Sequence, residues 1–389
     1  MTYALDDVVG NDDLFPVLRH WQYFNHAGVA PLSRVGAQTV SDWAKSWSEE
    51  AILGRDWFSV IRDVRQSAAE LIGGTAGEVA LLKNTSEGIS TVARGIDWRR
   101  GARIVTTAAE YPSNLYPWMD AADRRGLELV KVPETTGDDG AVRVSVDEII
   151  AEAGRGDTQM VAVSHVQWSS GQRLDLKRIG DFCHANGILF GVDAIQSVGV
   201  RPIDVEACHV DYLWAGCHKW QLGPLGCGLF YCSERVRDAT RPGLLGWHSV
   251  ADPFDWDTID LTLAEDAARY ECGSPNIPGL LLLRENHKLL LGLGTDAIAG
   301  HTATLTDRLI DGLRERGWQV LSPRGEGETS TIVTFTGDRD GEELVSSLRK
   351  DKKTELAIRS GRVRISPHVY NTPGQIDVLL TNLGSARAS

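Results

Sequence analysis

Short apolar segments alternate with helix-periodic segments through the middle of this chain, and this alternation restricts the possible fold more than any other feature. The apolar segments are four to six residues long, which is typical of buried strands. The alternation predicts an α/β fold built on an open, mainly parallel sheet with helices on both faces. The expected strands are 79–82, 103–107, 127–132, 160–165 and 188–193, and the expected helices are 89–96, 115–125, 146–153 and 176–186.

Polar residues come directly after several of these expected strands. Ligands of open parallel sheets bind outside the carboxyl ends of the strands, so we expect Thr85, Tyr111, Gln167 and Asp193 to converge on one site. Thr85 and Ser86 lie between a strand and a helix, where hydroxyl groups and free N–H groups can bind a phosphate. The alternative for this pair is a simple helix N-cap.

The segment 211–231 is predicted to be a strand, a sharp loop and a second strand, and the loop contains His218 and Lys219. In isolation such a lysine is usually a surface residue. If it is desolvated, its pKa falls and the neutral amine becomes a nucleophile. Asp193 ends a buried strand 26 residues earlier, where it is either a turn or cap residue or the partner of a cation. A protonated pyridine nitrogen is such a cation, so the pair indicates pyridoxal phosphate (PLP).

The length of 389 residues predicts two domains. We expect a large domain over 21–280 and a small α+β domain formed by 1–20 and 281–389. In the latter part, strands are expected at 331–335 and 362–365. Helices are expected at 277–316, with a break near 292–294, and at 341–349 and 375–383. A further helical stretch covers 34–73, with Trp57 on its apolar stripe.

The charge and the cysteines exclude several classes of function. The net charge is −13 without a basic run, so binding to nucleic acid or to an anionic membrane is not expected. No apolar run is long enough to span a membrane, and the N-terminus lacks the pattern of a signal peptide. The six cysteines form no CxxC pair, which argues against a metal site and a disulfide framework. We therefore expect a cytoplasmic protein with reduced thiols.

An ordered set of motifs extends this interpretation to a family. VDAIQSVG (192–199) and AGCHKWQLGPLGCGLFY (215–231) occur with YFNHAG, KNTSEGIS, EYPSN, HVQWSSG, ECGSPN and RVRISPHVYNT. Over about residues 22–385 the chain resembles the class V aminotransferases among the fold-type I PLP-dependent enzymes. This group includes cysteine desulfurases, selenocysteine lyases, kynureninase and isopenicillin-N-epimerase-like proteins. The resemblance implies a mainly parallel, seven-stranded type of sheet, PLP as cofactor and an α-amino acid as substrate.

The resemblance also implies a role for each matching residue. Lys219 resembles the catalytic Schiff-base lysine and Asp193 the partner of the pyridinium. Arg364 resembles the arginine that binds the substrate α-carboxylate, and Ser274 matches a segment that reaches the phosphate of a neighbouring subunit, which implies a homodimer with shared active sites. The remaining implied cofactor contacts are Thr85, Ser86 and His218 at the phosphate, Tyr111 stacked on the ring and Gln196 at the ring hydroxyl; Asn25, His26 and Trp168 are the expected substrate-side residues.

Departures from the family pattern bear on the reaction. Cysteine desulfurases carry a nucleophilic cysteine shortly before the arginine, but 354–364 contains no cysteine and none follows Cys272. Gly216 replaces a small hydroxyl residue, and Trp168 replaces an asparagine, which predicts an apolar wall beside the ring.

The expected activity is therefore β-elimination from an S-substituted cysteine or cysteine conjugate, the reaction of a C–S lyase. The alternatives are an aminotransferase, an epimerase or a decarboxylation-linked deaminase of the same class. A cysteine desulfurase is disfavoured, and a non-catalytic PLP-binding protein is a further alternative.

Overall fold

A computed structural model describes residues 3–386 of this chain except 52, 54, 55 and 57. Its centre is a seven-stranded sheet in the order β2-β10-β9-β8-β7-β3-β4. Neighbouring strands are parallel except for β10, which is antiparallel to both β2 and β9. The strands are β2 (Val79–Leu82), β3 (Arg103–Thr107), β4 (Glu128–Val132), β7 (Thr158–Ser164), β8 (Leu189–Asp193), β9 (Tyr212–Gly216) and β10 (Gly228–Cys232).

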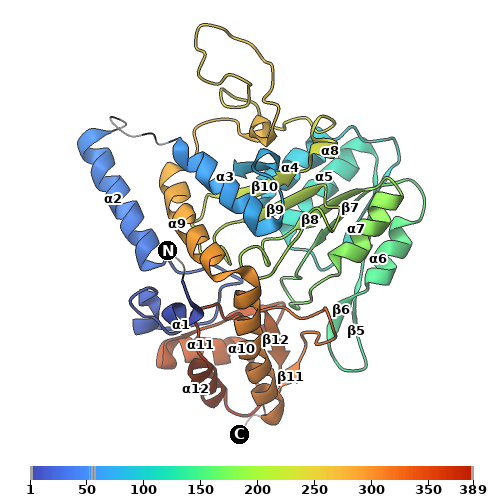
Figure 1. The fold of residues 1–389 in the computed structure, drawn as a ribbon. Helices are drawn as coiled ribbons and strands as arrows, with labels where there is room; N and C mark the ends of the chain where they lie inside the picture. Colours follow the sequence, from blue (N-terminus) through green and yellow to red (C-terminus); the bar gives the residue numbers. More distant parts are fainter. Residues whose placement is uncertain (1–2, 52, 54–55, 57, 387–389) are drawn as a thin grey trace.

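Helices cover both faces of this sheet, as the alternation predicts (Figure 1). One face packs on α3 (Ser59–Ile72), α6 (Val146–Ala153), α7 (Leu176–Ala185) and α9 (Ile277–Leu293), and the other on α4 (Thr85–Gly95) and α5 (Tyr116–Arg125). Along β9, Leu213 and Ala215 enter the first core, whereas Tyr212 and Trp214 enter the second. This is the period of two that a strand buried on both faces requires. The α/β fold class is therefore confirmed.

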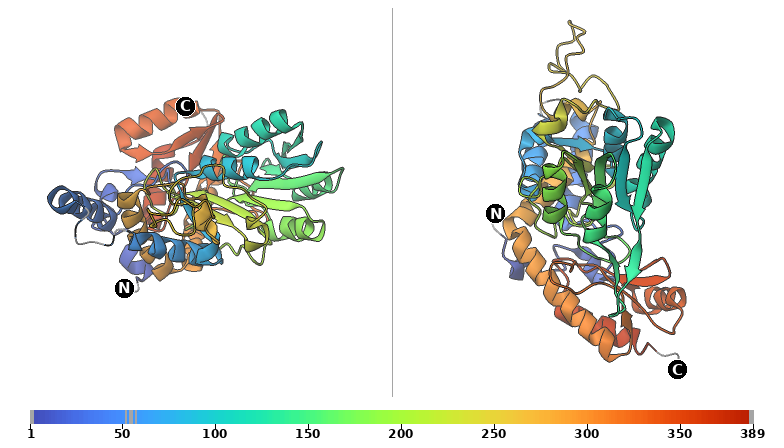
Figure 2. Two further views of the ribbon diagram at one scale, coloured as in Figure 1. Left: turned by 90° about the horizontal axis from the view of Figure 1, so that it is seen from above. Right: turned by 90° about the vertical axis from the view of Figure 1, so that its right-hand side faces the viewer.

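The C-terminal residues form a second sheet with its own core, which lies beside one end of the central sheet (Figure 2). Its strand order is β11-β12-β15-β14, and all pairs are antiparallel. The strands are β11 (Gln319–Val320), β12 (Val333–Thr336), β14 (Ala357–Arg359) and β15 (Arg362–Ile365). The helices are α10 (Thr295–Glu315), α11 (Gly341–Lys352) and α12 (Pro373–Leu383).

The expected boundary at residue 280 falls inside α9, whose Leu283, Leu289 and Leu290 belong to the core of the central sheet. The helix continues because its apolar periodicity does not stop before Gly294, which has a φ of 81°. We therefore propose that the second domain begins at Gly294.

The remaining elements lie around these two sheets. Residues 3–20 contain α1 (Leu5–Val8) and a separate 3₁₀ turn at Pro16–Arg19, and 34–73 contains α2 (Arg34–Glu50) and α3. Trp57 lies outside the described residues. Additional pairs are β1 (Gln22–Tyr23) with β13 (Thr354–Glu355), and the hairpin β5 (Glu134–Thr136) with β6 (Val142–Val144); a short α8 spans Glu234–Arg237. Among the described residues, no helix has the length and hydropathy needed to cross a membrane.

Candidate active site

A cavity of about 600 Å³ opens at the carboxyl ends of the central strands. Nine residues predicted from the sequence line it, and they come from loops of the central sheet and from the C-terminal sheet. They are Thr85, Ser86, Tyr111, Trp168, Asp193, Gln196, His218, Lys219 and Arg364. The convergence follows from the parallel order of the strands, because their carboxyl ends meet at one edge of the sheet.

Asp193 and Lys219 carry the main charges of the large-domain wall. Asp193 ends β8, is almost completely buried and accepts a hydrogen bond from the N–H of Ile195 at 3.0 Å. Burial raises its pKa, and the nearby Glu110 adds to this rise. Burial likewise lowers the pKa of Lys219, as do Arg364 and Arg359. The site therefore combines a carboxylate that is costly to charge with an amine that deprotonates easily.

The N-terminus of α4 provides a site for an anion. Asn84 is the N-cap, and its side chain accepts from the N–H of Glu87, so Thr85 and Ser86 are the first two helical residues. In this position their N–H groups have no acceptor within the helix. The hydroxyl of Thr85 accepts from the N–H of Gly216 at 2.9 Å, which leaves its own proton for a ligand. Helix dipole, N–H groups and hydroxyl together suit a phosphate.

Gln196 and His218 are held in place by the protein itself. The amide of Gln196 donates to the carbonyl of Ala27 at 3.2 Å and accepts from the indole of Trp220 at 2.9 Å. One amide proton is left over, and Gln196 also lines the cavity. Burial and the neighbouring Lys219 lower the pKa of His218 to about 4, so its ring is neutral at pH 7.

Arg364 forms the opposite wall, which belongs to the C-terminal sheet. It is 2% exposed, and its Nη1 donates to the carbonyl of Trp168 at 2.9 Å. Its Nε and Nη2 are buried without a hydrogen-bond partner among the described residues. These two atoms form the edge of a guanidinium that binds a carboxylate in a bidentate manner. Burial and Arg359 lower its pKa to about 9, which still leaves it charged at pH 7.

Aromatic side chains close the cavity from the side of β3 and β7. Tyr111 and Trp168 meet edge to face with ring centroids 5.4 Å apart, and the indole of Trp168 donates to the carbonyl of Ala109. The ammonium of Lys219 lies 5.8 Å from the centroid of Tyr111. Tyr111 remains about half exposed, so a flat ring can reach it from the cavity.

Four predicted residues do not line this cavity. Gln167, expected to converge with the other strand ends, is fully buried, and its side-chain amide donates to the carboxylate of Glu110 at 3.3 Å. His26 is fully buried, and its ring nitrogens contact the carbonyl of Ser366 and the hydroxyl of Tyr370. The structure therefore gives His26 a packing contact with the C-terminal residues in place of the expected position beside a substrate. The side-chain amide of Asn25 donates a hydrogen bond from Nδ2 to Oε1 of Glu355 at 3.2 Å. Ser274 is exposed in the loop before α9.

The lining also contains residues that the sequence interpretation missed, of which Arg359 is the most informative. Arg359 and Arg364 lie on the same face of the hairpin β14–β15, since Ala357 is paired with Arg364 and residues two apart share a face. The spacing of Arg359 and Arg364 in the sequence indicates a shared face only when the hairpin register is known. Its turn consists of Ser360 and Gly361, with φ of 51° and 73°. Only these two residues join β14 to β15, so the hairpin contains no longer loop.

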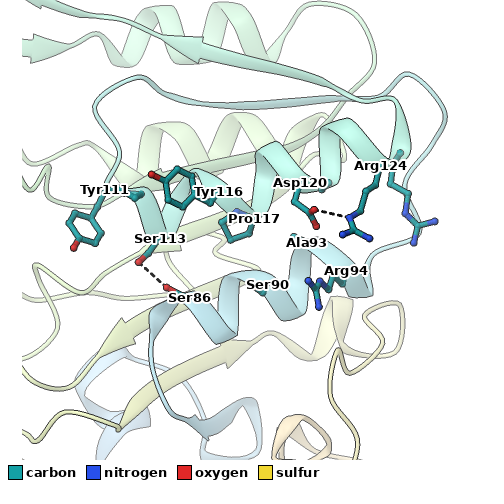
Figure 3. Close-up of a pocket in the computed structure, with 13 residues that line it drawn as sticks. Ser86, Ser90, Ala93, Arg94, Tyr111, Ser113, Tyr116, Pro117, Asp120 and Arg124 are labelled. Atoms are coloured by element: carbon teal, nitrogen blue, oxygen red, sulfur yellow. Dashed lines mark hydrogen bonds and ion pairs between the residues drawn. The ribbon is translucent and has the colours of Figure 1, made fainter.

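A groove between α4 and α5 adjoins the cavity at the N-terminus of α4 (Figure 3). Ser86, Tyr111 and Ser113 line both, and the hydroxyl of Ser86 donates to that of Ser113 at 2.9 Å. Tyr116 projects from this groove and is largely exposed.

These features fit PLP in kind and in position. The buried carboxylate suits a pyridinium nitrogen, the easily deprotonated amine suits an aldehyde, and the N-terminus of α4 suits a phosphate. No ion pair within the described part of the chain neutralises Asp193, so a cationic ring nitrogen would satisfy it.

Comparisons with known proteins agree. The family model for aminotransferase class V matches residues 38–388. A probable cysteine desulfurase of Pyrococcus abyssi is 31% identical over 81% of this chain and 80% of the relative. A probable cysteine desulfurase of Methanothermobacter thermautotrophicus is 29% identical over 94% of both chains.

Solved structures extend the likeness over nearly the whole chain. The apo cysteine desulfurase of Thermococcus onnurineus has a TM-score of 0.85 at 25% identity and covers 98% of this chain and 97% of its own. The cystine C–S lyase C-DES, in complex with its product cysteine persulfide, has a TM-score of 0.87 at 23% identity and covers 95% and 98%, which shows the fold alone. Another structure of C-DES carries glycine covalently linked to its PLP cofactor. The chain therefore belongs to the class V aminotransferase family and is a PLP-dependent enzyme.

Proposed function

We propose that this enzyme catalyses β-elimination from an S-substituted L-cysteine and releases a thiol or persulfide, pyruvate and ammonia. The observation that carries this proposal is a cavity with an amine and a carboxylate-binding arginine, but without a thiol in its lining. All six cysteines are described, and none lines the cavity. The two-residue turn at Ser360–Gly361 replaces the loop that would carry a sulfur acceptor. A C–S lyase needs no such acceptor, because the sulfur leaves with its own substituent.

The residues of the cavity divide the work of this reaction. Lys219 would hold PLP covalently, and the bound cofactor would withdraw electrons from Cα. Arg364 binds the α-carboxylate through Nε and Nη2, and Asp193 keeps the ring nitrogen protonated. The neutral amine of Lys219 would take the Cα proton. The electron pair of the Cα–H bond then forms a Cα–Cβ double bond, the Cβ–S bond breaks, and the sulfur departs with the bonding electrons. Hydrolysis of the three-carbon remainder yields pyruvate and ammonia.

Arg359 supplies a second positive charge on the substrate side. Its Nη1 donates to the carbonyl of Ile358 at 2.7 Å, and it forms no ion pair within the described part of the chain. It is close enough to lower the pKa of both Lys219 and Arg364. An S-substituent that ends in a carboxylate would neutralise it. Cystine is such a substrate, and C-DES, which shares this fold, is named a cystine C–S lyase.

We further propose a homodimer with shared active sites in the cytoplasm. The exposed position of Ser274 and the groove beside the phosphate end support the dimer, since a neighbouring chain could reach the cavity there. The six unpaired cysteines support a reducing compartment.

The reaction is tested by incubating the PLP-loaded enzyme with cystine and with S-aryl cysteines. Pyruvate and ammonia should appear in equal amounts, together with the persulfide or thiol. Lys219→Ala should lower the rate by about 10³-fold or more and remove the yellow colour of the enzyme, because both the covalent link and the base are lost. Lys177→Ala is the matched control, since Lys177 lies on the surface of α7 in an ion pair with Asp181.

Other outcomes separate the remaining class V reactions. Amino-group transfer to a keto acid without pyruvate would replace the lyase by an aminotransferase. Racemised substrate would indicate an epimerase. Carbon dioxide released with ammonia would indicate a decarboxylation-linked deaminase. A colourless wild-type enzyme that is indifferent to all these substrates would overturn the proposal.

A further inference from the structure

A second buried arginine lies away from the cofactor cavity. Arg201 lies in the loop that follows Asp193 at the end of β8, and it is only 8% exposed. Its Nε and Nη2 are buried and have no hydrogen-bond partner among the described residues. Its side chain forms no ion pair in that part of the chain either. A buried guanidinium without a counter-charge is costly, so this position needs an anion.

The protein surrounds Arg201 with more positive than negative charge. Burial, Arg173 and Arg324 together lower the pKa of Arg201 to about 10, and Asp307 opposes them. Asp307 is already paired with Arg324. The carboxylate that opposes the lowered pKa of Arg201 is therefore committed to another arginine, and the excess positive charge remains.

Two further unpaired donors belong to this cluster. Nε of Arg173 and Nδ1 of His165 are buried without a partner among the described residues. Burial lowers the pKa of His165 to about 3, and both Arg173 and Arg201 contribute. The three side chains thus lie close enough to influence one another, and all have an unsatisfied nitrogen.

A cavity of about 740 Å³ lies against this cluster, between the central sheet and residues 326–328 of the C-terminal part of the chain. Arg201 itself is not among its lining residues, whereas the adjacent Pro202 is. His165, Arg173 and Pro202 line it, beside α6, α7 and the hairpin β5–β6 that Figure 1 shows together. Its rim carries acidic as well as basic residues. Several are already engaged with protein groups: Asp147 with Arg178, Glu328 with Arg143, and Asp175 as the cap of α7. Of the other rim carboxylates, Asp204 accepts from the N–H of Ala207, and Glu326 lies in the outer loop.

We propose that Arg201, Arg173 and His165 bind a small, doubly charged oxyanion at this junction, separately from the cofactor. The Nε–Nη2 edge of Arg201 matches two oxygens of a phosphate or carboxylate group. Nε of Arg173 and Nδ1 of neutral His165, in the tautomer that carries its proton there, add donors. The chemistry shared by inorganic phosphate, sulfate and a short dicarboxylate fits these donors. Because the cluster touches both the central sheet and the C-terminal residues, the anion joins the two parts of the chain.

The proposal is tested by equilibrium dialysis of radioactive inorganic phosphate against the PLP-loaded enzyme, in which the cofactor already occupies the position for its own phosphate. One equivalent should bind per chain, and the melting temperature should rise by at least about 2 °C over a chloride control of equal ionic strength. Arg201→Met should lower the affinity at least tenfold and abolish the thermal shift. Arg364→Met should retain both responses.

Two further measurements identify the class of anion and test whether the buried charge of Arg201 is unpaired without it. Succinate and sulfate at matched ionic strength decide between dicarboxylates and inorganic oxyanions. Without added anion, Arg201→Met should melt at the same temperature as the wild type or higher, because an unpaired buried charge is removed. Arg173→Met serves if Arg201→Met does not fold. The proposal would be overturned if the wild type bound none of the three anions in a saturable manner. It would also be overturned if Arg201→Met and Arg364→Met bound phosphate equally well.

Discussion

Arg364 and Arg201 present the same unpaired edge in two different parts of the molecule. Both are more than nine-tenths buried, and in both Nε and Nη2 have no partner among the described residues. Arg364 is anchored through Nη1 and shares its cavity with Lys219 and Asp193. Arg201 has two arginines and a neutral histidine as neighbours. In both places the unpaired edge of the arginine favours an anionic ligand. Only the surroundings of Arg364 also contain an amine and a carboxylate that could take part in a reaction.

Removing the edge of Arg364 should have the larger effect on activity. Arg364→Met is expected to raise KM for α-amino acids by about 10²-fold, because a buried contact between charged groups is worth about 2–5 kcal/mol. Steady-state kinetics of pyruvate release measure this change. Arg308→Met is the control, since Arg308 lies on the surface of α10 and pairs with Asp377. An unchanged KM would mean that the carboxylate binds elsewhere, and the parallel with Arg201 would fail.

His165 should report on the positive charge near Arg201. Its pKa is about 3 in the folded state, below the ordinary value of 6.5, so protons bind more tightly to the unfolded chain. The contribution of His165 to stability is therefore complete above pH 6.5 and is lost as the pH falls towards 3. From pH 7 to pH 5, the free energy of unfolding of the wild type should fall by about 2 kcal/mol more than that of His165→Gln. Urea unfolding at each pH measures this difference.

Added phosphate sharpens the same experiment. A bound anion would offset the charges of Arg173 and Arg201, raise the pKa of His165 and reduce the difference between the two proteins. Equal pH dependence of wild type and variant would contradict the burial of an uncharged ring at this position.

The turn of the hairpin β14–β15 should affect one arginine and not the other. Gly361 has a φ of 73°, where a Cβ costs about 1–2 kcal/mol, so Gly361→Ala should lower the free energy of unfolding by about that amount. KM should rise a few-fold, because Arg359 and Arg364 shift with the hairpin, while phosphate binding should stay constant. Gly300→Ala is the control: Gly300 lies in α10 with open space around its Cα, and alanine favours a helix. A loss of phosphate binding in Gly361→Ala would couple the two regions.

Much of the fold could be predicted because it rests on local patterns. The helix expected over 146–153 has those bounds in the structure, and the break expected near 292–294 separates α9 from α10. The pairing of β10 with β2 joins segments that are far apart in the sequence, and periodicity carries no information about it.

The site shows the same division. Asp193 and Lys219 could be proposed from strand ends and a motif, and they do line one cavity. Arg359 could be recognised only through the register of the hairpin. His26 lies away from the expected site because the carbonyl of Ser366 and the hydroxyl of Tyr370 bind both of its ring nitrogens. Whether a buried arginine has a partner is a property of the tertiary structure, so Arg201 carried no signal in the sequence.

The bond from Arg364 to the carbonyl of Trp168 has a consequence for the energetics of substrate capture. It links a strand of the C-terminal sheet to a loop of the central sheet before any ligand arrives. The Nε–Nη2 edge, which we propose binds the substrate carboxylate, is thus held in one orientation by the folded chain itself. A receptor whose competent state is already the dominant one loses no affinity to a preceding conformational equilibrium. Folding therefore supplies the free energy needed to orient this arginine, and substrate binding does not have to supply it.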